Sequence, residues 1–137
     1  MSGAPYDIFE EVGEEGDMTT KGSGDWAEAL VAEYLRARGY RIDVSKYRCR
    51  FGEIDLVAHD RGMLCFVEVK MRSNLRYGLP REYVTYSKQE KLRTTAEYYL
   101  ATHDADVICR FDVAEVYTDK DHTPERTHIE YIENAFC

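Results

Sequence analysis

The stretch GEIDLVAHDRGMLCFVEVK, residues 52–70, decides which fold we expect for this chain. Its first half alternates polar and apolar residues, Asp60–Gly62 has the composition of a tight turn, and its second half is almost entirely apolar. These features predict two β-strands joined by a short turn. Side chains two positions apart on a strand face the same way, so Glu68 and Lys70 should share a face near the end of a central strand. The partner strand brings Asp55 to the same region.

Two carboxylates and an ammonium group on so apolar a pair of strands suggest a functional site. Burying such charges costs free energy unless they are paired or used. Asp55 and Glu68 offer oxygen ligands for a hard divalent cation, Mg²⁺ or Mn²⁺. Lys70 is placed to orient a water molecule or to neutralise charge on a phosphate group. The alternative that the sequence leaves open is a solvated ion pair between Glu68 and Lys70 at the end of the strand.

Length and composition indicate one globular domain. The 137 residues are 44% hydrophobic and 12% aromatic, which is enough for a single core. No apolar stretch approaches the ~20 residues of a membrane-spanning helix, and the N-terminus has no basic-then-apolar export pattern, so we expect a cytoplasmic protein without a membrane partner. Four cysteines without a CxxC motif indicate reduced thiols rather than a zinc site or disulfides. They are Cys49, Cys65, Cys109 and Cys137.

The charge is unevenly distributed along the chain. The net charge is −8, and residues 1–20 contain six acidic residues and no Lys or Arg. Residues 41–93, which include the candidate site, carry 12 basic and 7 acidic residues. A basic middle segment has the sign expected for contacts with phosphate, and ordinary surface charge is the alternative explanation. We therefore expect an acidic, flexible tail over residues 1–24 and a single domain over residues 25–137.

The remaining elements follow from the spacing of apolar residues. The expected order is one helix, three strands, a second helix and one or two strands. This order predicts an α/β (α+β) fold with a mixed central sheet and a helix on each face. Asp25 is the expected N-cap of the first helix, and Ser87 with Glu90 forms an expected capping box for the second. Outside the 52–70 hairpin we expect a helix over 26–38, a strand over 40–50, an irregular segment over 71–86, a helix over 87–102, and strands over 107–117 and 127–132.

Several charged residues near this hairpin are candidates for further roles in the site. Arg72 and Arg76 lie in the irregular segment after the central strand, and Lys88 and Lys91 lie in the first turns of the second helix. These four are candidates for contacts with a phosphate backbone, and a surface loop and a solvated helix face are the alternatives. Glu28, in the first turn of the first helix, either contributes to the site or simply suits the helix dipole.

The motifs resemble those of a known family. The order of elements, with Asp55 and Glu68-Val69-Lys70 on adjacent strands, resembles the PD-(D/E)xK nuclease superfamily, which has the restriction-endonuclease-like fold. More narrowly, the chain resembles the bacterial family called YraN or UPF0102 over about residues 24–117. It departs from the pattern at Ala27, where the family usually has glycine, and at Ile54, where the superfamily has proline. The matching residues are Glu28, Tyr34-Leu35, Gly39-Tyr40, Gly52 to Ala58, Phe66 to Lys70, Arg72, Lys88 and Arg110 to Val113.

The resemblance implies a site and a reaction class. Asp55 and Glu68 would be the ligands of Mg²⁺ or Mn²⁺, and Glu28 would complete the metal site or its water shell. Lys70 would be the catalytic lysine. The implied function is a metal-dependent nuclease that hydrolyses phosphodiester bonds in nucleic acid, with DNA as the first candidate. The alternative is a non-catalytic module on the same fold that binds nucleic acid or another protein, and the oligomeric state is left open.

Overall fold

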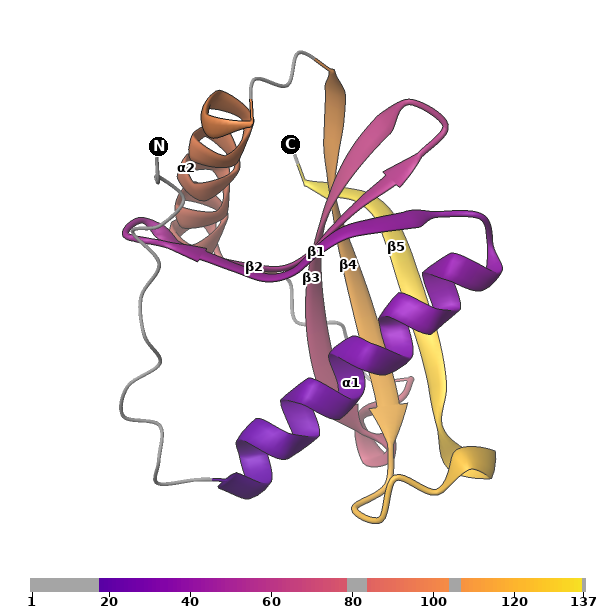
Figure 1. Cartoon of the computed structure of the whole chain (residues 1–137). Helices are drawn as coiled ribbons and strands as arrows, with labels where there is room; N and C mark the ends of the chain where they lie inside the picture. Colours follow the sequence, from indigo (N-terminus) through magenta and orange to yellow (C-terminus); the bar gives the residue numbers. More distant parts are fainter. Residues whose placement is uncertain (1–17, 79–83, 104–106, 137) are drawn as a thin grey trace.

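The computed structural model describes residues 18–78, 84–103 and 107–136. Seven helices and strands and two short 3₁₀ turns make up this part of the chain (Figure 1). In order they are α1 (Met18–Ala37), β1 (Arg41–Cys49), β2 (Gly52–Asp60), β3 (Met63–Ser73), η3 (Asn74–Arg76), α2 (Tyr86–Thr102), β4 (Ile108–Thr118), η4 (Pro124–Arg126) and β5 (His128–Phe136). The predicted order of elements is confirmed. No helix in the described residues is long and apolar enough to cross a membrane.

The strands form a single mixed sheet in the order β1-β2-β3-β4-β5. The first three are an antiparallel meander, as the short turns between them require. β4 runs parallel to β3, because α2 returns the chain to the end of the sheet where β3 begins. β5 then folds back on β4 as an antiparallel hairpin. The sequence-based expectation of a mixed sheet is therefore correct.

The two helices cover opposite faces of this sheet. α1 packs through Val31 and Leu35 on a core that includes Val67 of β3. α2 packs through Leu92 and Tyr99 on a second core that includes Phe66. Because neighbouring residues of a strand point to opposite faces, β3 contributes alternate side chains to the two cores. Figure 1 shows α1 crossing β3, β4 and β5 diagonally, well away from α2.

β2 separates from β3 halfway along its length, and this divergence positions the candidate site. Only Leu56–Asp60 pair with β3, whereas β2 remains paired with β1 down to Gly52. The free half of the hairpin reaches α2, where Ile54 joins the core beneath Leu92. Gly52 has φ +151, and a Cβ atom there would lie 2.9 Å from Oγ1 of Thr95, so only glycine allows this close approach without strain.

Several element boundaries differ from the sequence-based expectation. α1 begins at Met18, so Asp25 lies inside the helix and is not its N-cap. The predicted tail over 1–24 thus includes the first turns of α1, and residues 1–17 lie outside the described residues. The N-cap of α2 is Thr85, whose Oγ1 accepts a hydrogen bond from the Lys88 amide at 3.2 Å, so the predicted capping box at Ser87 is wrong.

Two strands are longer than expected, because each has a partner that continues alongside it. β3 extends to Ser73, which pairs with Thr118 of β4, although the polar composition there predicts an irregular segment. β5 extends to Phe136, which pairs with Phe111 and stacks on its ring at 5.0 Å between centroids. Backbone hydrogen bonds and ring contacts across the sheet therefore outweigh the local composition.

Candidate functional site

Asp55 lies at the point where β2 leaves β3. Its Oδ2 accepts a hydrogen bond from the Val69 amide at 2.8 Å. In a continuous ladder that amide would bond to the backbone of β2, and the carboxylate takes over this role where the strands separate. The hydrogen bond fixes the Asp55 carboxylate beside β3, one residue from Glu68.

Glu68 and Lys70 continue the face of β3 that packs on α2. Their even-numbered positions follow Phe66, so all three side chains point toward α2. The Glu68 side chain is buried, and its Oε2 lies 2.8 Å from Nζ of Lys88 and 3.8 Å from Nζ of Lys70. The structure therefore brings two lysines from different elements to one carboxylate oxygen.

The carboxylates of this region act on one another electrostatically. Burial, followed by the negative charge of Glu68, raises the pKa of Asp55 from 3.8 to about 8, against the hydrogen bond from Val69. Glu28 and Glu53 raise it further. The part of this rise that comes from the neighbouring acids reflects negative charge around Asp55, which favours a cation.

The two lysines respond in opposite ways to the same surroundings. Burial, followed by the positive charge of Lys88, lowers the pKa of Lys70. Burial also lowers the pKa of Lys88, but its hydrogen bond to Glu68 and the charge of Glu68 outweigh this effect and raise it. Lys88 is thus the principal ion-pair partner of Glu68, a role that the sequence did not indicate.

Glu28 reaches the neighbourhood of the site from α1, on the other side of the sheet. Nζ of Lys46 lies 2.6 Å from Oε1 of Glu28 and 2.6 Å from Oδ1 of Asp25. Sequence reasoning missed Lys46, because nothing local distinguishes it from the other polar residues of β1. Its backbone has φ 58, an uncommon conformation for a lysine within a strand.

The chemistry of these side chains fits a hard divalent cation. Asp55 and Glu68 supply carboxylate oxygens, which Mg²⁺ and Mn²⁺ prefer, and the negative charge of Glu68 adds to the effect of burial in raising the pKa of Asp55. No three His, Cys, Asp or Glu side chains within the described residues form a ready-made metal cluster. Glu28 and Glu68 face lysines instead. The metal site expected from the sequence stays a prediction.

The predicted phosphate-binding residues fall into two groups. Lys88 and Lys91 line a pocket of about 370 Å³ at the N-terminal end of α2, together with Thr85 and Ser87. Nη2 of Arg72 instead lies 3.4 Å from Oε2 of the buried Glu115, so this guanidinium faces inward.

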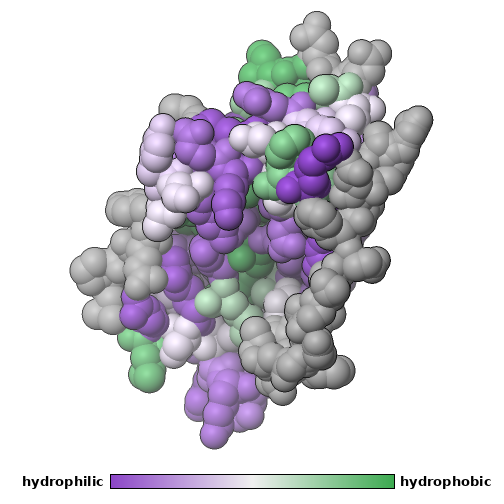
Figure 2. All heavy atoms as spheres, turned by 90° about the vertical axis from the view of Figure 1, so that its left-hand side faces the viewer, coloured by the Kyte–Doolittle hydropathy of each residue, from purple (hydrophilic) through white to green (hydrophobic). Residues whose placement is uncertain are grey.

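The surface around these residues is largely hydrophilic. Arg76 is exposed in η3, beyond the end of β3. Figure 2 views the molecule from the side where α2 and the tip of the β1–β2 hairpin lie, and its hydrophilic side chains surround a small apolar recess. On this side of the molecule, the surroundings of the recess are therefore hydrophilic.

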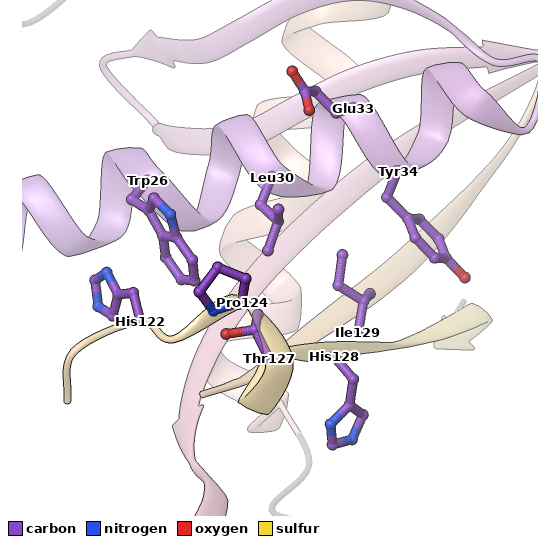
Figure 3. Close-up of a pocket in the computed structure, with 9 residues that line it drawn as sticks. All are labelled: Trp26, Leu30, Glu33, Tyr34, His122, Pro124, Thr127, His128 and Ile129. Carbon is purple, nitrogen blue, oxygen red and sulfur yellow. The ribbon is translucent and has the colours of Figure 1, made fainter. Parts of the chain in front are cut away.

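A larger pocket lies elsewhere and has a different character. It measures about 530 Å³ and lies between α1 and the segment that leads into β5 (Figure 3). The Trp26 and His122 rings stack at one end, with 4.0 Å between their centroids. The lining residues are Trp26, Leu30, Glu33, Tyr34, His122, Pro124, Thr127, His128 and Ile129. Asp55, Glu68 and Lys70 do not line it, whereas the pocket at the start of α2 is lined by Lys88, the ion-pair partner of Glu68, so we place the candidate site beside that pocket.

The five-stranded mixed sheet with a helix on each face, with Asp55 and the Glu68-Val69-Lys70 tripeptide on its diverging strands, is a restriction-endonuclease-like fold. The chain belongs to uncharacterised protein family UPF0102, whose sequence model matches residues 27–116. That range includes Glu28, Asp55 and Lys70, so the candidate site lies within the family region.

The chain aligns with relatives in this family over nearly the whole length of each relative. The chain is 47% identical over 114 residues to a UPF0102 protein of Symbiobacterium thermophilum, covering 82% of this chain and 94% of the relative. It is 41% identical over 121 residues to a UPF0102 protein of Lachnoclostridium phytofermentans, covering 87% and 96%. A UPF0102 protein of Nitrosomonas europaea is 40% identical over 113 residues, covering 82% and 92%.

Proposed function

We propose that this protein is a metal-dependent nuclease that hydrolyses phosphodiester bonds in nucleic acid, with DNA as the first substrate to test. The observation that carries the proposal is the meeting of two carboxylates and a lysine where β2 and β3 diverge. Asp55 is fixed beside β3 by the Val69 amide, and Nζ of Lys70 lies 3.8 Å from Oε2 of Glu68.

Each of these side chains has a role that its surroundings support. Asp55 and Glu68 would hold the Mg²⁺ or Mn²⁺ ion, and Glu28 would complete its surroundings from α1. The bound ion supplies Lewis acidity and lowers the pKa of a water molecule. Lys70 donates from its ammonium group to a phosphate oxygen and stabilises the negative charge that develops there. Without a metal ion, the raised pKa of Asp55 favours its protonated form. The positive charge of a bound metal ion would lower this pKa, and Asp55 would then lose its proton.

The surface beside this site suits a phosphate backbone. Lys88, Lys91 and Ser87 line the pocket at the N-terminal end of α2, where the helix dipole also favours an anion. Arg76 adds an exposed positive charge at the end of β3. Arg72 already pairs with Glu115, so we assign it to the support of β3 and β4 rather than to the substrate.

One observation favours the alternative, a non-catalytic module that binds nucleic acid. Two of the three proposed carboxylates already have a lysine within ion-pair distance, Glu28 with Lys46 and Glu68 with Lys88. Such pairing is what a protein that uses these acids only for stability would need. The two functions differ in turnover and not in binding, so a cleavage assay separates them.

The decisive experiment is cleavage of linear duplex, single-stranded and branched DNA, with RNA in parallel, in Mn²⁺, Mg²⁺ or EDTA. We expect cleavage with either metal, none in EDTA, and loss of about 10³-fold or more in Lys70→Ala, because the charge that stabilises the transition state is gone. Lys120→Ala, which removes the same charge from an exposed loop, is the matched control and should cleave like the wild type.

Stability separates the two explanations of Lys70. A catalytic lysine at the edge of the site contributes little packing, so Lys70→Ala should melt close to the wild type. If Lys70 only neutralises Glu68, its loss should lower stability markedly instead. Binding of DNA without cleavage under every metal condition, combined with a destabilised Lys70→Ala, would establish the non-catalytic module.

A further inference from the structure

Lys88 reaches the candidate site from α2, whereas Asp55, Glu68 and Lys70 lie on β2 and β3. The cap at Thr85 fixes the first turn of α2, since Oγ1 of Thr85 accepts from the Lys88 amide. From this turn the side chain extends to β3, where its Nζ lies 2.8 Å from Oε2 of Glu68. Nζ of Lys70, on the same strand as Glu68, lies 3.8 Å from that oxygen. The closer of the two lysines is therefore the one from α2.

The position of Lys88 is unfavourable for the helix taken alone. A positive charge in the first turn opposes the helix dipole. The ion pair with Glu68 offsets this cost, and the two side chains differ strongly in exposure. The Glu68 side chain is 9% exposed, whereas that of Lys88 is 44% exposed. Lys88 can therefore return to solvent by rotating its side chain, while Glu68 must stay where the strand places it.

We infer that Lys88 is the internal counter-cation of the metal-free site, which neutralises Glu68 until a divalent cation takes its place. The inference rests on the proposed function, because it concerns the metal ion that Glu68 and Asp55 would hold. A metal ion on the carboxylate of Glu68 and an ammonium group 2.8 Å from the same carboxylate repel each other. Metal binding therefore displaces Lys88 from Glu68, toward the pocket at the start of α2 that it already lines.

This arrangement has a cost and a benefit that can both be measured. Displacing an ion pair weakens metal binding, because part of the binding free energy goes into breaking the contact. The metal-free protein gains stability, because Glu68 does not remain as an unpaired buried charge. Lys88 is thus a positioning residue for the metal site, in addition to any contact that it makes with phosphate.

The test is calorimetric titration of Mn²⁺ into metal-free wild type, Lys88→Met and Lys91→Met. Methionine keeps the apolar stem of the lysine and removes its charge. Lys91 lines the same pocket one turn further along α2 and, within the described part of the chain, makes no ion pair with Glu68, so it controls for the general loss of one positive charge. We expect Lys88→Met to bind Mn²⁺ about tenfold more tightly than the wild type, and Lys91→Met to stay within about twofold.

Thermal melting in EDTA and in saturating Mn²⁺ provides a readout that does not depend on activity. Lys88→Met should melt below the wild type in EDTA and should gain more from Mn²⁺, because the metal then neutralises a carboxylate that has lost its partner. If Lys88→Met does not fold in EDTA, Lys88→Gln keeps a hydrogen-bond donor without the charge, and it should show the same tighter binding.

The outcomes separate this inference from the proposed function. If the wild type binds Mn²⁺ and Lys88→Met and Lys88→Gln bind it no more tightly, Lys88 is not a counter-cation, although the metal site stands. If neither the wild type nor any variant binds Mn²⁺, the metal-dependent function and this inference both fail. Equal tightening in Lys88→Met and Lys91→Met would show general electrostatics and would also overturn the inference.

Discussion

Asp112 and Asp55, two aspartates of the sheet, have very different surroundings. Asp112 on β4 is fully buried, and Nε of Arg110 donates to its two oxygens at 2.9 and 3.1 Å. The Tyr131 hydroxyl and the Asn134 amide donate to the same carboxylate at 2.5 and 2.9 Å. Asp55 accepts a single hydrogen bond, from Val69, within the described residues, and its pKa is raised to about 8.

This difference separates a structural acid from a candidate functional one. The Asp112 carboxylate is satisfied on both oxygens, and it replaces backbone pairing at the bulge between β4 and β5. Burial of a charge is then compatible with stability. Asp55 lies beside another acid, Glu68, and forms no ion pair within the described part of the chain, an arrangement more frequent at functional sites than elsewhere. Both aspartates belong to motifs that resemble the family, so sequence alone does not distinguish their roles.

The largest effect on stability is expected at the satisfied site. Asp112→Asn removes the charge that holds Arg110 and replaces two acceptor oxygens by one, so it should lower the free energy of unfolding by about 3–5 kcal/mol. Urea denaturation followed by circular dichroism measures this change, with Asp121→Asn in the exposed loop after β4 as the matched control. A loss below about 1 kcal/mol would show that the hydrogen bonds around Asp112 add little to stability. The contrast between Asp112 and Asp55 would then fail.

The same substitution at the candidate site is expected to have the opposite sign. Asp55→Asn keeps the shape and an oxygen acceptor for the Val69 amide, and removes the repulsion with Glu68. In EDTA at pH 8 it should raise the free energy of unfolding by about 1–2 kcal/mol. The gain should vanish or reverse in saturating Mn²⁺, because the variant has lost one proposed ligand. If Asp55→Asn is less stable than the wild type in EDTA, Asp55 has a structural role like that of Asp112.

A further effect is expected on the pH dependence of stability. The pKa of Asp55 is about 8 in the folded protein and near 3.8 when the chain is unfolded, so the folded state binds the proton more tightly. The contribution of Asp55 is therefore complete below about pH 4 and is lost as the pH rises through about 8. Metal-free wild type should lose stability over this window more steeply than Asp55→Asn, as urea titrations at pH 5, 6, 7 and 8 would measure.

Mn²⁺ sharpens this pH prediction, because a metal ion binds the deprotonated carboxylate. Its affinity should rise with pH up to about 8 in the wild type. Parallel slopes for wild type and Asp55→Asn in EDTA would contradict the raised pKa and remove the main electrostatic distinction between the two aspartates.

The sequence by itself determined the order of the elements and the approach of Asp55 to Glu68 and Lys70. Alternation of polar and apolar residues specifies strands, and the hairpin over 52–70 has the composition that places Asp55 beside Glu68 and Lys70. These features are local, since a strand assigns its side chains to two faces with a period of two residues. The order of strands and helices follows from the same patterns and from the short connections between them.

Only the tertiary structure decided which partners the charged residues have. Lys88 meets Glu68 because α2 packs over β3. Lys46 meets Glu28 because α1 lies beside β1. Arg72 turns inward to Glu115 because β4 runs parallel to β3. Such ion pairs join residues far apart in the chain, and no periodicity encodes them. The end of β3 at Ser73 and the cap of α2 at Thr85 also depend on neighbouring elements, because backbone pairing and packing across the sheet outweigh local preference.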